Sequence, residues 1–297
     1  LIAKDQEGKR VMLQLFTDTS ANLPVALTKQ HHITVVPFSY TVDGKETDYP
    51  DDVDFDGAAF YGAMRRGAVV KTSMVNPDLM AKYFERALSQ GDDVLYVGMS
   101  GGISGTAQAA VIAAGELTGK YPERKIVTID TYAASLGEGL QVLEAARMIE
   151  EGKSLDEIKT HLLARRPHMC QFFTVDDLAY LKRGGRISGA TALIGTVLSI
   201  KPILCGDETG HIVSCGKVRG MKRAYQELAN YYDGRALDKG EMLGIAYADN
   251  EEGAQALIAL LREKGFTGEC LNVVYEPVTG AHVGPGTVAL FFYGKEK

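Results

Sequence analysis

The sequence predicts an α/β protein of two domains: a mostly parallel sheet with helices on both faces, then a smaller mixed-sheet α/β domain. Strand-like and helix-like segments alternate through the first half, which is typical of βαβ units. The second half mixes hairpin signals with helices, and a length of 297 residues favours two domains. An arginine pair followed by Pro167 marks the expected boundary, so the predicted domains are 1–166 and 167–297.

The first half contains four β-rich segments, each followed by helix signals. The expected strands are 11–18, 33–42, 93–98 and 125–130. The expected helices are a short one after Pro24, then 55–66, a helix from Pro77, 106–117, and one ending near 151. Asn76 is a good N-cap for the helix that starts at Pro77, and Gly91 lies just past its end. Ser154 and Glu157 form a capping box for one further helix.

The second half begins with an expected strand over 168–175 and a helix capped by Thr174 and ending at Gly184. An apolar helical stretch over 188–200 leads into a strand over 201–207, and 210–220 returns antiparallel to it. A helix, a strand over 241–250, a helix to Lys264 and strands over 270–277 and 287–294 complete the chain. This succession favours a smaller mixed-sheet domain.

Composition and charge limit the function classes. The net charge is -6 and no basic stripe interleaves with aromatic residues, so nucleic acid is not an expected partner. No apolar run approaches the roughly 20 residues that span a bilayer, and we expect no stable membrane insertion. The four cysteines form no C-x-x-C and no zinc-finger spacing, so we expect a cytoplasmic protein without a metal. Cys205 and Cys215 could face each other across a hairpin.

Loops at the carboxyl ends of parallel strands are the candidate ligand site, because ligands bind there in open α/β sheets. These loops are 18–22, 98–104 and 130–135, and the loop before Asn76 could join them. Neither a G-x-G-x-x-G after the first strand nor a P-loop lysine is present, so no nucleotide cofactor is expected.

Gly98, Ser100 and Gly102 match G-x-S-x-G, the nucleophile elbow of serine hydrolases. A serine esterase or acyl hydrolase that uses Ser100 is therefore one alternative, with Asp130 or Asp249 and then His282 in the required order. A glycine-rich turn with Ser104 as a helix cap is another. In a third, Ser100, Ser104 and loop amides, with Thr72 and Ser73 of a second helix start, hold one carboxylate at the mouth of an apolar cavity.

Basic residues and one histidine stand out in the second half. Lys182, Arg183 and Arg186 surround a glycine pair where a helix is expected to end. Cations there satisfy free helix carbonyls, or they form a positive rim for an anionic group. His282 is expected in a stiff turn with Gly284, Pro285 and Gly286, from which it could donate to a carboxylate or steady an arginine.

Several glycine-containing blocks, taken in order, resemble the DegV family, the bacterial fatty-acid-binding proteins that include the FakB subunits of fatty acid kinase. The blocks are DTSANLP (18–24), KTSMVNP (71–77), MSGGISGTAQAA (99–110), LAYLKRGGRIS (178–188), IKPIL (200–204), GKVRG (216–220) and HVGPGT (282–287). The resemblance implies two α/β domains and a buried long-chain fatty acid. It also implies a carrier without a catalytic residue or cofactor, which presents the carboxylate to a dihydroxyacetone-kinase-like fatty acid kinase for acyl-phosphate formation.

The resemblance also assigns residues. It implies that Thr72, alone or with Ser73, and serines of the 98–106 loop hold the carboxylate, and that Arg186 and His282 form a supporting network. The second serine of the family's pair falls on Gly101 here, so Ser100, Ser104 or the Gly101 amide must replace it. Arg219 matches an arginine that the resemblance links to docking of the kinase.

Overall fold

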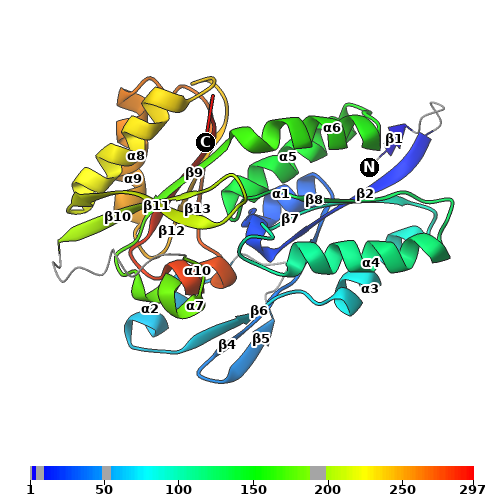
Figure 1. The fold of residues 1–297 in the computed structure, drawn as a ribbon, viewed down its shortest axis with the longest axis horizontal. Helices are drawn as coiled ribbons and strands as arrows, with labels where there is room; N and C mark the ends of the chain where they lie inside the picture. Colours follow the sequence, from blue (N-terminus) through cyan, green and yellow to red (C-terminus); the bar gives the residue numbers. More distant parts are fainter. Residues whose placement is uncertain (1, 5–9, 49–54, 188–198) are drawn as a thin grey trace.

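The chain folds around three β-sheets, which a computed structural model describes for residues 2–4, 10–48, 55–187 and 199–297 (Figure 1). A mainly parallel sheet and a six-stranded mixed sheet lie side by side, and a small antiparallel sheet extends from them. The α/β class with one parallel and one separate mixed sheet is therefore confirmed. The proposed division at residue 166 stays a prediction.

The parallel sheet has the order β3-β2-β7-β8, and β1 pairs antiparallel with the start of β2. Its strands are β1 (Ile2–Lys4), β2 (Arg10–Asp18), β3 (Ile33–Val36), β7 (Asp93–Gly98) and β8 (Ile126–Asp130). Helices α5 (Leu136–Glu150) and α6 (Leu155–Arg165) cover one face, and α3 (Pro77–Leu88) and α4 (Thr106–Lys120) cover the other (Figure 1). The helix α1 (Val25–Gln30) connects β2 to β3.

Local capping signals fix several helix starts as the sequence predicts. The Asn76 side chain accepts a hydrogen bond from the Leu79 amide at 2.8 Å, with Pro77 in the first turn of α3. Ser154 and Glu157 form the predicted capping box of α6. These side chains satisfy amides that have no partner within the helix, which is why the boundaries can be predicted from sequence.

The β-rich segment 33–42 forms two strands in different sheets rather than one. Pro37 has no amide hydrogen for a ladder, so β3 ends before it and β4 (Ser39–Val42) begins after it. β4 lies between β5 (Lys45–Asp48) and β6 (Val70–Ser73) in the three-stranded antiparallel sheet. The helix α2 (Gly57–Arg65) precedes β6.

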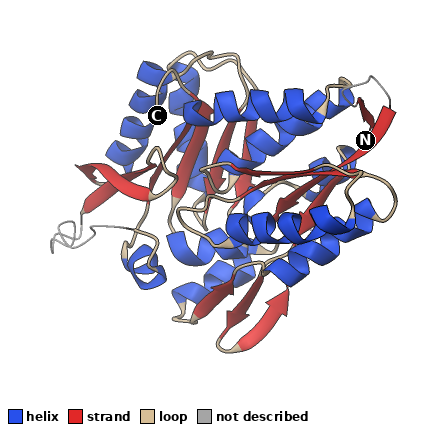
Figure 2. Cartoon of the chain, turned by 45° about the vertical axis from the view of Figure 1, so that its right-hand side comes forward, coloured by secondary structure: helices blue, strands red, loops and turns tan. Residues whose placement is uncertain are grey.

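The mixed sheet has the order β11-β10-β9-β14-β12-β13; among its described strand pairs, β12 and β13 are parallel and the others antiparallel. Its strands are β9 (Met169–Thr174), β10 (Ile200–Gly206), β11 (Ile212–Arg219), β12 (Leu243–Tyr247), β13 (Cys270–Val274) and β14 (Val288–Tyr293). The helices of this half are α7 (Ala179–Gly184), α8 (Met221–Arg235), α9 (Glu251–Glu263) and α10 (Pro277–Val283) (Figure 2). α8 and α9 pack on one face of the sheet.

The helix α7 starts later than the sequence predicts. The expected N-cap at Thr174 is wrong, because Thr174 is the last residue of β9 and pairs with Val288, and α7 begins only at Ala179. The apolar helical stretch predicted over 188–200 lies mostly outside the described residues, which resume at 199. Within the described part of the chain, no helix is both long and apolar enough to cross a membrane.

Candidate ligand-binding site

An apolar cavity lies where the parallel sheet, the mixed sheet and the small antiparallel sheet meet. The volume of this cavity that the centre of a water molecule can reach is about 70 Å³. One water molecule requires ~10–15 Å³ on the same measure, so the cavity is several times larger than that. Its apolar walls are Phe38, Met74, Met99, Ile103, Ala133, Ala134, Phe173, Leu181, Ile212, Tyr275, Val278, Val283 and Phe291. A space with mostly apolar walls suits an apolar ligand group rather than a polar one.

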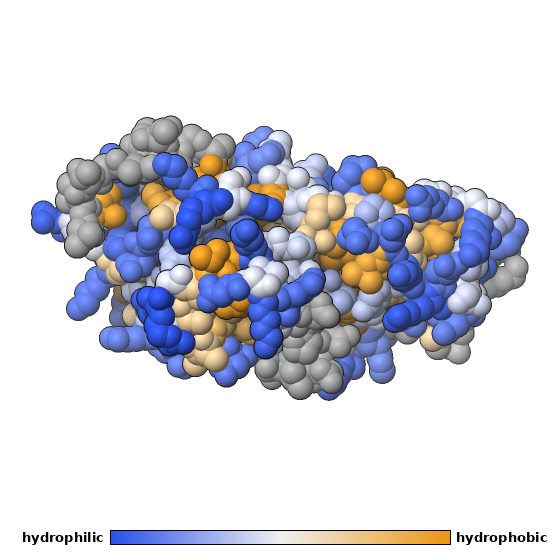
Figure 3. Space-filling model, turned by 90° about the horizontal axis from the view of Figure 1, so that it is seen from below, coloured by the Kyte–Doolittle hydropathy of each residue, from blue (hydrophilic) through white to orange (hydrophobic). Residues whose placement is uncertain are grey.

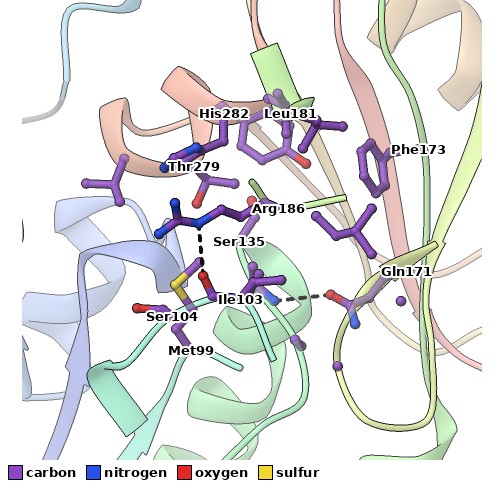
Figure 4. A pocket seen from close by; sticks show the side chains of 18 of the residues that line it. Met99, Ile103, Ser104, Ser135, Gln171, Phe173, Leu181, Arg186, Thr279 and His282 are labelled. Atoms are coloured by element: carbon purple, nitrogen blue, oxygen red, sulfur yellow. Dashed lines mark hydrogen bonds between the residues drawn. The ribbon is translucent and has the colours of Figure 1, made fainter. Parts of the chain in front are cut away.

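Thr72, His282 and Arg186 form a polar group at one end of this cavity. Thr72 Oγ1 lies 2.9 Å from His282 Nε2. Arg186 donates from Nε to the Ile103 carbonyl at 3.1 Å and from Nη1 to the Gly184 carbonyl. Figure 4 shows the Arg186 side chain between His282 and Ile103. β6, α10 and the segment after α7 therefore contribute one residue each.

The expected loop position of His282 is wrong, because His282 lies in the last turn of α10, whose C-cap is Gly284. Its ring packs directly against the end of α7. A Cβ at Gly184 would overlap Nδ1 of His282 and lie 3.0 Å from its Cε1. Gly184, the last residue of α7, thus gives the imidazole room beside Thr72.

The charge of His282 depends on its surroundings. Burial, and then the charge of Arg186, lower its pKa from the ordinary 6.5 to about 4. The imidazole is therefore neutral near pH 7, and Arg186 is the cationic side chain among the described residues that line the cavity. A neutral imidazole can donate from Nε2 to Thr72, which leaves the threonine hydroxyl hydrogen free for a ligand.

This pKa shift predicts a pH effect on stability. The unfolded histidine binds a proton at 6.5 and the folded one only near 4, so stability falls as pH drops through this window. Between about pH 7.5 and about pH 5, the wild type should lose ~2 kcal/mol more unfolding free energy than His282→Gln. Urea unfolding at the two pH values measures this, and equal losses in both proteins would contradict it.

Ser100 and Gly101 lie outside the cavity lining. Ser100 is fully buried; its Oγ donates to the Gly210 carbonyl at 2.9 Å and accepts from the Gly102 amide at 3.1 Å. The Gly101 amide donates to Asp130 Oδ2 at 3.0 Å. None of the described histidines is hydrogen-bonded to Ser100. The G-x-S-x-G loop therefore joins the 206–211 turn to the parallel sheet and has no activated serine, which argues against the esterase alternative.

The remaining predicted residues divide between the cavity and the surface. Ser104 lines the cavity, and its Oγ lies 3.0 Å from Thr106 Oγ1 just before α4. Ser73, next to Thr72, is exposed and absent from the cavity wall, as strand alternation requires. Arg219 is exposed at the end of β11 and lies outside this cavity.

A second, more polar cavity adjoins the first and shares Thr72, Arg186 and His282 with it. We call it the outer basin; its other lining residues are Met64, Ala68, Val69, Val70, Lys71, Tyr180, Arg183, Gly184 and Ala281. The space open to water centres within it is about 310 Å³. Figure 3 shows the molecule from below, a mainly hydrophilic face with scattered hydrophobic patches. Val69 and Met74, which flank β6, are both exposed.

Ser135, Gln171 and Thr279 also line the cavity, although no sequence motif marks them. Gln171 accepts from the Ala134 amide at 3.1 Å and donates to the Tyr132 carbonyl at 2.9 Å, so it connects β9 to the loop after β8 (Figure 4). Gln171 is a polar residue in a strand of alternating pattern, so the sequence does not predict that it connects β9 to this loop. The loops 98–104 and 130–135 and the one before Asn76 do contribute to the wall, as their positions predict.

The loop 18–22 instead belongs to a buried polar network. Asp18 accepts from Tyr96 Oη at 2.5 Å and from the Met99 amide at 3.1 Å. Glu138 accepts from Thr17 and Ser20, and burial raises the pKa of both carboxyl groups. No group of three or more metal-ligating side chains is arranged for a metal ion in the described ranges. The network holds the start of α5 against β2.

The geometry defines an α/β protein with an apolar cavity that has one threonine, one histidine and one arginine where it meets the outer basin. The family model described as "Uncharacterised protein, DegV family" matches residues 12–295. A DegV domain-containing protein of Clostridium perfringens is 38% identical over 286 residues, covering 95% of this chain and 98% of the relative. The chain belongs to the DegV family.

Solved structures of the family give the same fold. A DegV family protein from Thermus thermophilus, described for its fatty acid binding, superposes with a TM-score of 0.85 at 33% identity and covers 96% of this chain and 100% of its own. A fatty acid-binding DegV family protein from Streptococcus agalactiae also has a TM-score of 0.85, at 30% identity and with the same coverage.

Proposed function

We propose that this protein binds a long-chain fatty acid, with the alkyl chain in the apolar cavity and the carboxylate beside Thr72, Arg186 and His282. The observation that carries the proposal is the position of this trio at the junction of the apolar cavity and the outer basin. Solved relatives of the same fold are described as fatty acid-binding proteins. Burying ~14 methylenes at roughly 0.8 kcal/mol each gives ~11 kcal/mol of gross transfer free energy.

The polar trio fixes the direction of the ligand. The Thr72 hydroxyl donates to one carboxylate oxygen, and the Arg186 charge offsets the cost of bringing that carboxylate out of water. Arg186 has no acceptor for Nη2 among the described residues, so this nitrogen can donate to the ligand. Ser104 is the neighbour that replaces the family serine missing at Gly101, because it lines the cavity and Ser100 does not.

The outer basin explains how a bound carboxylate is reached. Lys71 and Arg183 line it together with the trio, so an anionic phosphoryl donor meets positive charge in front of the carboxylate. We infer that the protein is a carrier that presents the fatty acid to a fatty acid kinase for acyl-phosphate formation, without a catalytic residue of its own. Arg219 is our candidate for kinase docking, since it is exposed at the end of β11.

Thr72→Val tests the position of the carboxylate. Valine keeps the shape of the side chain and removes the hydroxyl, so affinity for a long-chain fatty acid should fall about 10- to 100-fold. Displacement of a fluorescent fatty acid measures the affinity. Ser73→Ala is the matched control and should bind as the wild type does, because Ser73 is exposed and outside the cavity wall.

Two outcomes would contradict different parts of the proposal. Equal affinity in Thr72→Val and Ser73→Ala would show that the carboxylate lies elsewhere. A delipidated wild-type protein that takes up no fatty acid, measured by native mass spectrometry, would contradict fatty acid binding itself.

A further inference from the structure

Two cysteines lie on the hairpin formed by β10 and β11 and line the same cavity. Cys205 lies in β10 and Cys215 in β11. The ladder pairs Ile203 with Gly216 and Leu204 with Ser214, so Cys215 is the extra residue of a β-bulge. A bulge redirects the side chain of its extra residue. Cys215 is exposed and Cys205 is half-buried, so reagents reach the pair from solvent.

Both thiols line a third cavity, which we call the rear basin. The space open to water centres within it is about 790 Å³. It is lined by Tyr132, Arg166, Pro167, His168, Phe172, Cys205, Gly206, Asp207, Glu208, Cys215, Tyr231, Arg235, Lys295, Glu296 and Lys297. Gly206 lines both this basin and the apolar cavity, so the hairpin separates the two. A basin of this size admits a small oxidant to the thiols.

The surroundings of Cys215 lower the pKa of its thiol from the ordinary value of 9.0, although burial acts in the opposite direction. A hydrogen bond from the Cys205 thiol lowers the pKa of Cys215, and Tyr231 and Arg235 of α8 act in the same direction. The Arg235 guanidinium lies 5.4 Å from the ring centroids of Phe172 and Tyr231. The same interaction raises the pKa of Cys205, which stays protonated. Burial raises the pKa of Cys170 to about 12 and that of Cys270 to about 11, so both are inert thiols.

We propose that Cys205 and Cys215 are a redox-active dithiol that hydroperoxides convert reversibly to a disulfide. The Cys215 thiolate attacks one peroxide oxygen, the O–O bond breaks, and the leaving alkoxide or hydroxide takes up a proton. The products are a Cys215 sulfenic acid and an alcohol or water. Cys205 sulfur then attacks the Cys215 sulfenic sulfur, and the S–O bond breaks with release of water. Two thiols are oxidised, and one peroxide is reduced.

The hairpin connects this chemistry to the apolar cavity. Gly206, Gly210 and Ile212 line that cavity, and the Gly210 carbonyl accepts the Ser100 hydroxyl hydrogen bond. A bond between Cys205 and Cys215 draws the bulged strand toward β10, and it changes the wall on the other side of the hairpin. Oxidation therefore changes the rate of fatty acid release. This consequence rests on the proposed function, whereas disulfide formation does not.

Thiol reactivity tests the first step on the full-length wild-type protein. Under limiting iodoacetamide near neutral pH, Cys215 should alkylate at least about tenfold faster than Cys270, as peptide mapping measures. Cys205→Ala removes the donor to Cys215, so it should slow this alkylation while Cys270→Ser leaves it unchanged. Equal rates at Cys215 and Cys270 in the wild type would overturn the proposal.

Peroxide treatment tests the second step. Wild type and Cys270→Ser should each lose two hydrogens by intact mass, with a Cys205–Cys215 peptide that dithiothreitol releases. Cys205→Ser should gain one oxygen on Cys215 that dimedone traps. Retention of both thiols, or a bond between two molecules, would overturn the proposal. Fatty acid uptake by the reduced protein is measured alongside. An unchanged release rate after oxidation would overturn the coupling alone, and failed uptake would contradict the proposed function alone.

Discussion

Gly210→Ala should lower the unfolding free energy by ~3 kcal/mol or more, because the new methyl group has no room. A Cβ at Gly210 would overlap Ser100 Oγ and lie 3.0 Å from the Tyr132 Cα. The backbone φ of 80° adds a cost of its own for any residue with a side chain. The change should also weaken fatty acid binding, because Gly210 lines the apolar cavity. Urea unfolding and ligand titration measure the two effects.

Gly44→Ala is the matched control for Gly210→Ala. Gly44 has a φ of 83°, and no atom lies within 4 Å of the position that its Cβ would take, so only the backbone cost remains. We expect a loss of about 1–2 kcal/mol there. Equal losses at the two glycines would show that the hairpin does not pack tightly against Ser100.

A double variant distinguishes the steric overlap between Ser100 and a Gly210 methyl group from the loss of the hydrogen bond between Ser100 and the Gly210 carbonyl. Ser100→Gly removes the atoms that a Gly210 methyl group meets first, and it also removes the donor to the Gly210 carbonyl. Ser100→Gly with Gly210→Ala should be more stable than the sum of the single losses predicts, by about 1–2 kcal/mol. An additive result would contradict direct contact between these two residues.

Signals that act within a few residues made most of the fold predictable. The capping box of Ser154 and Glu157 and the Asn76 cap satisfy amides of their own helices, so sequence alone reveals them. Thr174 failed as a cap because its backbone pairs with Val288, far away in the chain. The sheet that takes up Thr174 forms only when distant strands meet, and no local pattern reports that choice.

Some of the predicted site residues line the cavity and others do not, and contacts between distant parts of the chain decide which. Thr72 and Ser73 are equivalent in a sequence, but neighbouring strand residues face opposite ways, and the pairing of Thr72 with Tyr40 turns Thr72 to the inside. Ser100 was a candidate because of the glycines around it. In the structure its hydroxyl donates a hydrogen bond to the carbonyl of Gly210, which lies 110 positions later in the chain. The residues next to Ser100 give no indication of this contact.

Arg186→Met should weaken the binding of a long-chain fatty acid by about 30- to 100-fold, because a carboxylate in the proposed position loses its cation. The methyl ester of the same acid carries no charge, so its affinity should change by less than about threefold. Arg183→Met is the matched control. Arg183 lines only the outer basin and lies over the Tyr180 ring, so its removal should leave binding of both ligands close to that of the wild type.

Comparing the fatty acid with its methyl ester distinguishes the effect of the Arg186 charge from the effect of its hydrogen bonds to the cavity wall. This side chain also donates to the Ile103 and Gly184 carbonyls, so the competing explanation for weaker binding is a distorted cavity wall. A distorted wall weakens the acid and the ester alike, whereas a lost charge weakens only the acid. Arg186→Lys keeps the charge without the planar fork and should fall between wild type and Arg186→Met for the acid. Equal losses for acid and ester in Arg186→Met would assign Arg186 to the wall rather than to the carboxylate.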